Sequence, residues 1–434
     1  MSAARKEIDY EDGLRLVRQL VAAGRFAVAV RWTDHLCRQR PKDPRAHNQA
    51  GLVRQRQGEP QEAAPHFRRA ALLQPEAGEI WANLGRSLRL SAAIEPAFRC
   101  RRRAVLCQPE MPEMRLAYGF DLLTVGEYRA GFAEYEHRPD RNTGLARYEA
   151  AGLSAWDGRI RPNGRLIVVT EQGAGDVVQF LRFVEPLAKQ GMRVTVACPR
   201  PLERVVRSAP GVEATAPLWP SGPLQGYDGV EMLLSLPNRL GIDLASLPAP
   251  ARYISPPEGG YRVEPDGRLR VGVCWTGSTF TPLNPMRRIP FAELARVLDV
   301  PGLSFYGLQV LIGRRETYGE DRLVDLAPHI EDFSDTAAMV DQMDLVITVD
   351  TSIAHIAGAL GKPVWTLLAR VADWRWGRDG ETTPWYPSMR LFRQDRQGDW
   401  AGVVDRVVSA LRQRVEAPVG LAERRPFASP DPTG

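Results

Sequence analysis

A repeat of 34 residues constrains the first third of this chain more than any other feature. Two residue types keep the spacing in phase, namely Pro41, Pro75 and Pro109 and the glycines Gly51, Gly85 and Gly119. A period of this length is typical of stacked helix pairs, none of which can bury its apolar face without a neighbour. The beginning of the chain is therefore predicted to be a helical array, a form suited to docking another protein.

Alanine and aromatic positions follow the same period and indicate the repeat type. The segments Trp81-x-x-Leu84-Gly85 and Ala63-x-x-x-Phe67-x-x-Ala70-x-x-x-x-Pro75 resemble the tetratricopeptide (TPR) consensus. Small residues let paired helices approach closely, and larger ones fill the spaces between neighbouring pairs. Four repeats fit the spacing, at 8–41, 44–77, 78–111 and 112–138. We therefore predict a TPR domain over residues 1–145.

Composition limits the remaining possibilities. A chain of 434 residues, of which 44% are hydrophobic, is long enough for two or three domains. It has no run of 18 uncharged apolar residues, and its first residues are too charged for a signal peptide, so a cytoplasmic protein without a membrane span is expected. The five cysteines form no C-x-x-C pair and have no histidine at ligand spacing in the sequence. Neither a zinc site nor a disulfide framework is therefore predicted.

The positive charge lies mainly on the repeats. The net charge is +5, and the first 150 residues hold 25 of the 57 basic residues but only 19 of the 52 acidic ones. A basic face could meet an acidic partner or a nucleic acid. Helix pairs are, however, commonly solvated by arginine. We therefore expect a protein partner and no nucleic acid.

Short apolar runs alternate with helical patterns after residue 147. The first series has strands at 166–169 and 193–197 and helices at 177–190 and 201–208. After a proline-rich segment at 246–267, the second series has strands at 269–275, 303–308, 345–349 and 363–367 and helices at 291–298, 336–342, 353–360 and 403–411. Such alternation predicts βαβ units and two Rossmann-like domains facing a cleft, at 146–250 and 266–414. Residues 415–434, rich in proline and charge, are predicted to be a disordered tail.

The first candidate site follows the strand at 166–169. In Gly173-Ala174-Gly175-Asp176, the glycines allow close approach of a ligand, and the following helix offers free N–H groups to an anion. Asp176 has two interpretations. It is either a helix cap or a general base that accepts the proton of an attacking hydroxyl.

The second candidate site follows the strand at 345–349. Asp350, Thr351 and Ser352 lead straight into a helix, which predicts a phosphate or pyrophosphate cradle at the strand end. His355 stands one helical turn after Thr351 and could reach the same ligand. The alternative is a helix cap with a packed histidine.

The third candidate site follows the strand at 269–275. Thr276 and Gly277 belong to a glycine-containing loop, and Arg287 could engage phosphate oxygens and neutralise a departing diphosphate without a metal. A solvated loop is the alternative. Gln309, at the end of the next strand, is a candidate for contacting a nucleobase. The aromatic residues Trp374, Trp376, Trp385 and Tyr386 could stack on a ligand or pack against the C-terminal helix.

These segments resemble one glycosyltransferase family. The strand-G-x-G-Asp-helix of 166–180, Arg287-x-x-Pro290 and Val349-Asp350-Thr351-x-x-x-His355 are similar to motifs of the heptosyltransferase-like family 9 enzymes. The resemblance covers about 165–412 and implies a GT-B fold, Asp176 as the acceptor's base, and Asp350 beside the donor sugar and diphosphate. Arg287 stands where that family has a lysine, which keeps the charge and alters the geometry.

The whole architecture resembles bacterial chains that join TPR repeats to such a domain, a group that includes flagellin O-glycosyltransferases. The segments Trp374-Arg375-Trp376 and Pro384 to Gln394 carry this resemblance. It implies a glycosyltransferase that moves a sugar from a nucleotide donor to a hydroxyl of a protein docked on the repeats, flagellin being one candidate. No metal or other cofactor is expected. Two alternatives stay open: a transferase acting on lipopolysaccharide or another glycan, and a non-catalytic binding scaffold.

Overall fold

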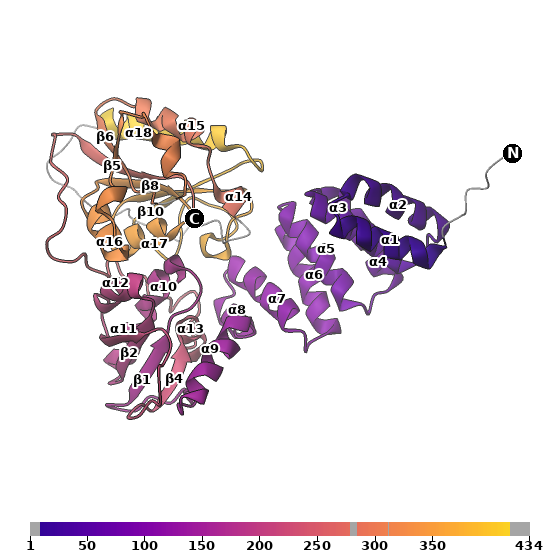
Figure 1. The fold of residues 1–434 in the computed structure, drawn as a ribbon, viewed down its shortest axis with the longest axis horizontal. Coiled ribbons are helices and arrows are strands. Elements are labelled where there is room, and N and C mark those ends of the chain that lie inside the picture. The colour runs from indigo at the N-terminus through magenta and orange to yellow at the C-terminus, as the bar shows by residue number, and fades with distance from the viewer. Residues whose placement is uncertain (1–8, 278–283, 311, 417–434) are drawn as a thin grey trace. The chain divides into compact units, whose positions relative to one another are not determined.

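The chain is described by a computed structural model over residues 9–277, 284–310 and 312–416. Its contacts divide it into two compact units, Met1–Leu123 and Thr124–Gly434. The first unit is built from helices and the second from two parallel sheets with their covering helices (Figure 1).

Helix pairs make up the first unit, as the 34-residue period predicts. The helices are α1 (Tyr10–Ala22), α2 (Phe26–Gln39), α3 (Pro44–Gln57), α4 (Pro60–Leu73), α5 (Gly78–Leu90), α6 (Ile94–Cys107) and α7 (Pro112–Thr124). Each of the first three predicted repeats is one pair, and successive pairs pack on each other. The TPR prediction for this region is confirmed.

Small residues at the periodic positions let the paired helices touch. A Cβ atom on Gly51 of α3 would lie 2.6 Å from the ring of Phe67 on α4, so this glycine makes room for the aromatic side chain. Ala63 and Ala97, one period apart, are fully buried. The repeat-ending proline also has a role, because Trp81 Nε1 donates a hydrogen bond to the Pro75 carbonyl oxygen at 2.9 Å.

The second unit begins with two helices and a four-stranded parallel sheet. The helices are α8 (Tyr128–Tyr135) and α9 (Pro139–Ala150), and the strands are β1 (Arg165–Val169), β2 (Arg193–Cys198), β3 (Val212–Pro217) and β4 (Gly229–Met232). The strand order is β3-β2-β1-β4. Helices α10 (Ala174–Phe180), α11 (Val184–Lys189), α12 (Glu203–Arg207) and α13 (Leu236–Arg239) complete this half.

Helix α9 was not anticipated from the sequence, which predicts the end of the TPR domain at residue 145. Its Tyr148 packs with Ile167, Val169 and Met232 of the sheet. Strands β3 and β4 were also missed. β3 is partly exposed along its length, and β4 has only four residues, so neither carries the apolar run that revealed β1.

A six-stranded parallel sheet forms the other half. Its strands are β5 (Leu269–Cys274), β6 (Leu303–Gly307), β7 (Leu323–Asp325), β8 (Leu345–Val349), β9 (Val364–Leu368) and β10 (Met389–Arg393). Their order, β7-β6-β5-β8-β9-β10, is that of a Rossmann fold. The helices are α14 (Asn284–Arg287), α15 (Phe291–Leu294), α16 (Phe333–Asp341), α17 (Ser352–Ala359) and α18 (Trp400–Glu416).

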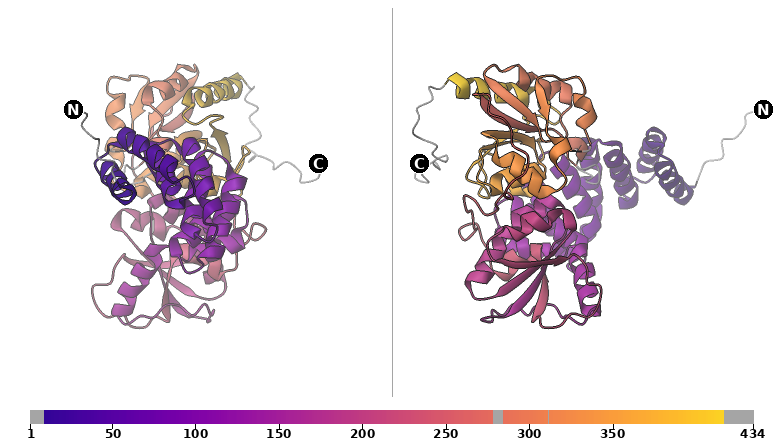
Figure 2. Two further views of the ribbon diagram at one scale, coloured as in Figure 1. Left: turned by 90° about the vertical axis from the view of Figure 1, so that its right-hand side faces the viewer. Right: turned by 60° about the vertical axis from the view of Figure 1, so that its left-hand side comes forward.

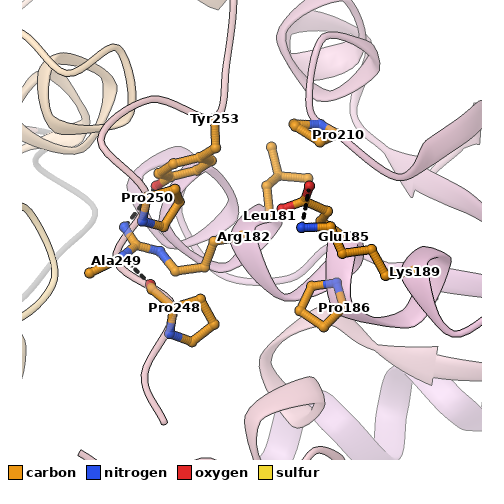
Figure 3. Close-up of a pocket in the computed structure, with 10 residues that line it drawn as sticks. All are labelled: Leu181, Arg182, Glu185, Pro186, Lys189, Pro210, Pro248, Ala249, Pro250 and Tyr253. Atoms are coloured by element: carbon orange, nitrogen blue, oxygen red, sulfur yellow. Dashed lines mark hydrogen bonds and ion pairs between the residues drawn. The ribbon is translucent and has the colours of Figure 1, made fainter. Parts of the chain in front are cut away.

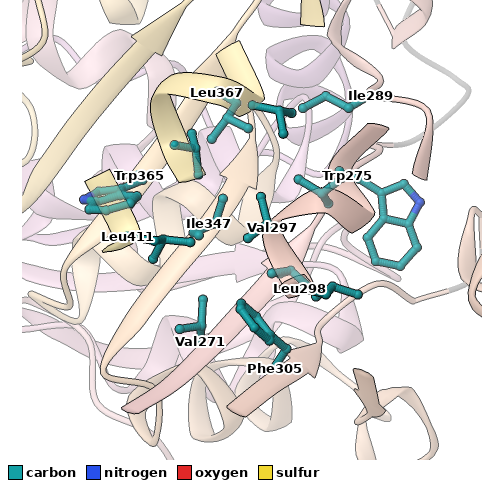
Figure 4. Packing of buried hydrophobic residues seen from close by; sticks show 14 of the residues in the cluster. Val271, Trp275, Ile289, Val297, Leu298, Phe305, Ile347, Trp365, Leu367 and Leu411 are labelled. Atoms are coloured by element: carbon teal, nitrogen blue, oxygen red, sulfur yellow. The ribbon is translucent and has the colours of Figure 1, made fainter. Parts of the chain in front are cut away.

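One face of this sheet is covered by an apolar core. Val271, Ile347 and Leu367 of the strands pack against Val297 and Leu411 of the covering segments, all buried (Figure 4). Helices α16 and α17 lie on the opposite face, between this sheet and the first half (Figures 1 and 2). There α17 packs against α10, so the two Rossmann-like halves meet through these helices. The prediction of two Rossmann-like domains is confirmed.

Domain limits within the chain stay a prediction. Helix α8 and the first half of α9, which lie inside the predicted TPR domain of 1–145, fall in the second compact unit. The C-terminal helix α18 extends to Glu416, and most of the predicted tail at 415–434 lies outside the described residues. Within the described ranges, no helix combines the length and the apolar character needed to cross a lipid bilayer.

Candidate active site

The beginnings of the helices that follow β1 and β8 come into direct contact. Both lie at the carboxyl ends of parallel strands, where open α/β sheets bind ligands. A Cβ atom on Gly175 would lie 2.7 Å from Cδ2 of His355 and 3.3 Å from Cα of Ser352. The beginnings of α10 and α17 can therefore meet only because residue 175 has no side chain. The structure brings together the first two predicted sites.

Asp176 has a capping role and also faces the other half. Its Oδ2 accepts a hydrogen bond from the Gly173 N–H at 2.9 Å, which closes the first turn of α10. Its Oδ1 accepts a hydrogen bond from Nη2 of Arg375. The cap that the sequence offered as one interpretation is present, and the carboxylate is ion-paired as well. The role of Asp176 as a base stays a prediction.

Arg375 connects the two halves at this point. It follows β9 within Trp374–Trp376, and its buried guanidinium donates to Gln179 Oε1 at 2.6 Å and to Asp373 Oδ1 at 2.8 Å. Burial alone would lower the pKa of Arg375, but the carboxylates of Asp176 and Asp373 raise it above its usual value. The side chain therefore carries its charge throughout the physiological range.

A second arginine continues this network. Arg287 Nε lies 3.2 Å from Asp350 Oδ2, and Arg287 Nη2 lies 3.4 Å from Asp373 Oδ2. Acidic and basic groups thus alternate along one line, which we call the acid–arginine chain: Asp176, Arg375, Asp373, Arg287 and Asp350. The sequence predicts that Arg287 meets a diphosphate, but here its guanidinium is paired with two carboxylates. A phosphate group would therefore have to compete with these carboxylates for Arg287.

The pKa values of the two aspartates that contact Arg287 shift in opposite directions. Burial raises the pKa of Asp350, against the opposing effect of Arg287. Asp373 is partly buried, but the charges of Arg375 and Arg287 overcome the effect of burial and lower its pKa. Asp373 is therefore the firmly ionised centre of the acid–arginine chain, and the sequence motifs did not single it out.

The remaining residues of the second site are packed. Thr351 is the residue before α17, and its Oγ1 lies 3.0 Å from Thr348 Oγ1. His355 is buried, its Nδ1 lies 2.9 Å from Tyr386 Oη, and its ring stacks on Trp376 at 5.2 Å. Burial lowers the pKa of His355 well below its usual value, so the ring is neutral. These contacts favour the packed-histidine interpretation. Donor contacts of Asp350, Thr351, Ser352 and His355 stay predictions.

The third site is held by a buried glutamine. Gln309 Oε1 accepts the backbone N–H groups of Thr276 at 3.1 Å and Trp275 at 3.3 Å. This carbonyl therefore fixes the loop after β5, and contact of Gln309 with a nucleobase stays a prediction. Gly277 is the last described residue before the segment 278–283, which lies outside the described residues.

The tryptophan-rich segment after β9 is buried between elements. Trp374, Trp376, Trp385 and Tyr386 are all almost completely buried. Trp385 contacts the rings of Phe180 on α10 and Tyr128 on α8. Of the two predicted roles, packing is therefore the one the structure favours, with α8 and α10 as partners in place of the C-terminal helix.

Arg182 is a further residue that the motifs did not reveal. It lies just after α10, buried, and donates to the Trp385 carbonyl oxygen at 2.6 Å and to Tyr253 Oη at 2.9 Å. It also lines a pocket of about 260 Å³ with Glu185, Lys189 and Pro250 (Figure 3). None of the predicted site residues lines this pocket.

In the part of the chain that the structure describes, side chains with metal-ligand spacing occur in the helical repeats, at Cys37, His47 and His66.

Comparisons with known proteins agree with the motif analysis. Residues 292–400 match the model of glycosyltransferase family 9 (heptosyltransferase). Protein FlbA of Caulobacter vibrioides is 26% identical over 463 residues, which covers 89% of this chain and 75% of that protein. The matched segment contains Asp350 and Arg375, whereas Asp176 and Arg287 precede it.

Two solved glycosyltransferases are similar in structure to a limited degree. The ADP-heptose lipopolysaccharide heptosyltransferase II of E. coli has a TM-score of 0.40 and 14% identity, covering 58% of this chain and 98% of the enzyme. A mutant O-GlcNAc transferase of Thermobaculum terrenum has a TM-score of 0.31 and 16% identity, covering 95% and 93%. The chain combines TPR repeats with a segment that matches the family 9 glycosyltransferase model, and this match supports glycosyltransferase activity.

Proposed function

We propose that this chain, in which TPR repeats precede a family 9 glycosyltransferase segment, transfers a sugar from a nucleotide donor to a hydroxyl of a protein held by the repeats. The observation that carries the proposal is the meeting of the starts of α10 and α17, where Asp176 pairs with Arg375 of the other half. A GT-B enzyme needs acceptor-activating and donor-binding groups from opposite halves. Asp176 and the pair Asp350–Arg287 supply such groups.

The proposed reaction is a direct displacement at the sugar. The acceptor oxygen bonds to the anomeric carbon as the bond from that carbon to the diphosphate breaks, and the diphosphate leaves with the electron pair. Asp176 takes the hydroxyl proton, for which its carboxylate must be ionised and near the acceptor. Arg375 Nη2 pairs with Asp176 Oδ1 and so holds the carboxylate at the junction of the two halves.

Arg287 is proposed to neutralise the leaving diphosphate. It is partly exposed, whereas Asp350, which it contacts, is buried. When the diphosphate binds, its oxygens replace a carboxylate as the partner of Arg287. The guanidinium is therefore paired both before and after the donor binds. Stabilisation of this kind needs no metal, and none is proposed for the reaction.

The repeats are proposed to select the acceptor. TPR arrays present extended surfaces for other proteins, and the basic excess of this region suits a partner with acidic segments. Flagellin is the proposed acceptor class because chains that pair such repeats with such a domain include flagellin O-glycosyltransferases. A nucleotide sugar made in the cytoplasm would be available to this chain at its predicted cytoplasmic location.

Replacement of Asp176 tests the proposal. Asp176→Asn keeps the size of the side chain and the acceptor atom for the Gly173 N–H, but removes the base. We expect transfer to fall by about 100-fold or more, with donor affinity unchanged, as measured by sugar transfer to purified acceptor and by calorimetry with the nucleotide sugar.

The chain offers a closely matched control in Asp335. This residue occupies the same third position of a capped helix, α16, and Asp335 Oδ1 likewise pairs with an arginine of the other half, Arg204, at 2.7 Å. Asp335→Asn should leave transfer close to that of the native chain. Equal losses in both variants would assign Asp176 a structural role and contradict its role as a base.

The family model favours one alternative acceptor, because its description names heptosyltransferases. Mass spectrometry of labelled products separates the two cases: sugar on a polypeptide supports the proposal, and sugar on lipid or glycan overturns the acceptor assignment. A native chain that neither transfers nor hydrolyses a panel of nucleotide sugars, while still binding its protein partner, would instead be a scaffold.

A further inference from the structure

Three potential metal ligands converge in the helical repeats. Cys37 comes from α2, His47 from α3 and His66 from α4, and each offers a ligand atom within 4.8 Å of the others. All three residues are partly buried, Cys37 is a free thiol, and the two imidazole rings are 6.2 Å apart. The group therefore joins the second helix of the first repeat to both helices of the second repeat.

His47 is already oriented as a metal ligand would be. Its Nε2 lies 3.0 Å from the Pro41 carbonyl oxygen. A carbonyl only accepts, so Nε2 carries the proton and Nδ1 has the free lone pair. This Nδ1 is buried and has no hydrogen-bond partner among the described residues. Ligating histidines commonly donate their other N–H to a backbone carbonyl in this way, which sets the ring orientation.

The next repeat provides an internal comparison. One period later, Trp81 occupies the position of His47 and makes the same hydrogen bond, from Nε1 to the Pro75 carbonyl oxygen at 2.9 Å. The positions of Cys37 and His66 are taken there by Ala71 and Cys100. Helix packing at this boundary therefore does not require a thiol and two imidazoles. Three departures from the repeat pattern meet at one point.

We propose that Cys37, His47 and His66 bind a zinc ion that joins the first two repeats. One thiolate and two imidazoles suit Zn²⁺, which prefers sulfur and nitrogen ligands. Three protein ligands leave one tetrahedral position for water. Binding requires the ligand atoms to draw together, because Zn–S and Zn–N bonds are only about 2.0–2.3 Å long. None of the three side chains is fully buried, which leaves them room to move.

Charge and proton balance agree with this assignment. The Cys37 thiol gives its proton to solvent as the Zn–S bond forms, so binding releases one proton. Arg54 lies near the group and opposes a cation, but it is paired with Asp34, its Nη2 donating to Asp34 Oδ1 at 2.7 Å. The carboxylate thus offsets the guanidinium. The proposal is independent of the proposed transferase activity.

Cobalt is the probe for the experiment, because Co²⁺ replaces Zn²⁺ in such sites and a thiolate ligand gives it a near-ultraviolet charge-transfer band. The full chain, stripped with a chelator, should bind one equivalent of Co²⁺ with this band. Added Zn²⁺ should abolish the band by displacement. Zinc should also slow hydrogen exchange in α2, α3 and α4, since binding stabilises the folded repeats.

The variants copy the next repeat so that folding is preserved. Cys37→Ala and His47→Trp introduce the residues found one period later, and His66→Gln removes the third ligand. Each should weaken zinc binding by about tenfold or more, and Cys37→Ala should abolish the charge-transfer band. Matched controls are Cys107→Ser, in another repeat, and His35→Gln, on the same helix as Cys37. Both should bind like the native chain.

Three results would overturn the site. One is a native chain that binds no Co²⁺ or gives no charge-transfer band. Another is a band that survives Cys37→Ala unchanged. The third is a loss in Cys107→Ser or His35→Gln as large as that in the ligand variants, which would indicate nonspecific binding.

Discussion

The contacts that stabilise the helical unit join residues close together in the sequence, whereas those that stabilise the two-sheet unit join residues far apart. In the repeats, side-chain contacts join neighbouring elements, as when Gln55 Nε2 donates to Ser87 Oγ one helix pair away. In the two-sheet unit, Arg375 and Asp176 are 199 residues apart, and Arg182 and Trp385 are 203 apart. The stability of a repeat stack is the sum of contributions from single repeats and their nearest neighbours, whereas a site between two domains depends on segments from the whole chain.

The two units also use different groups at their most constrained contacts. Repeat packing relies on small residues against apolar ones, such as Gly51 beneath Phe67. The junction of the Rossmann-like halves instead buries charge, in the acid–arginine chain and at Arg182. Buried charges stabilise only while they stay paired. The junction of the two halves should therefore be sensitive to the loss of a single charged residue, as should the helical unit at Asp121, which is buried and paired with Arg89 and Arg101.

The largest expected effect is that of Arg375→Ala. It leaves Asp176 and Asp373 without their common partner, and breaking a buried ion pair costs about 3–5 kcal/mol. Hydrogen exchange followed by mass spectrometry should show faster opening in the two-sheet unit and unchanged rates in α1–α6. Sugar transfer should be lost as well.

Arg378→Ala is the control for this variant. Arg378 lies three residues further on and pairs with Asp379 in solvent, so its loss should cost less than about 1 kcal/mol. If Arg375→Ala accelerated hydrogen exchange in the repeats, the two units would be energetically coupled. Their stabilities could then not be treated as separate.

Phe67→Ala should have a comparable effect on the other unit. The side chain is fully buried between α3 and α4, and truncation of a buried phenylalanine costs about 3–5 kcal/mol because it leaves a cavity. Faster exchange is expected in the adjoining helix pairs, with the two-sheet unit unaffected.

Leu72→Ala provides the comparison within the same helix. Leu72 is 67% exposed, so its truncation should change stability by no more than about 0.5 kcal/mol. If Phe67→Ala were as mild as Leu72→Ala, the periodic aromatic position would not be a core position.

The smallest expected effect concerns pH and His355. Burial holds the pKa of His355 well below its usual value in the folded chain, whereas the unfolded chain has a pKa near 6.5. Below about pH 6.5 the unfolded state therefore binds a proton that the folded state does not. Stability of the two-sheet unit falls as pH falls, by up to about 1.4 kcal/mol per pH unit from this group.

His355→Gln should remove this contribution. Urea unfolding of both chains at about pH 7.5 and about pH 5.5, on either side of the histidine pKa, measures it as the difference between their pH dependences. A slope equal in the native chain and the variant would show that His355 accepts a proton in the folded state.

Much of the fold could be predicted, and the reason differs between units. The period identified α1–α6 because the same local packing recurs every 34 residues. Apolar runs identified β1, β5 and β8 because these strands are central and buried. Strands β3, β7 and β10 were missed because they lie at sheet edges, and an edge strand needs no continuous apolar run.

The candidate site was predictable only in part. Asp176 and Asp350 could be placed at strand ends from the local pattern, because a strand, a turn and a helix follow one another in the chain. Asp373 and Arg182 had no such signal. Their importance comes from partners in distant segments, and one sequence does not record which distant segments meet.

By itself, the sequence determined the helical repeats, the two Rossmann-like series and the positions of the loops after β1, β5 and β8, since these depend on neighbours along the chain. Only the tertiary structure decided how charges are paired across the two halves, that the tryptophan-rich segment is packed against α8 and α10, and that Cys37, His47 and His66 meet. The physical reason is the same in each case. Ion pairing, burial and metal ligation depend on separation in space, which the sequence does not specify.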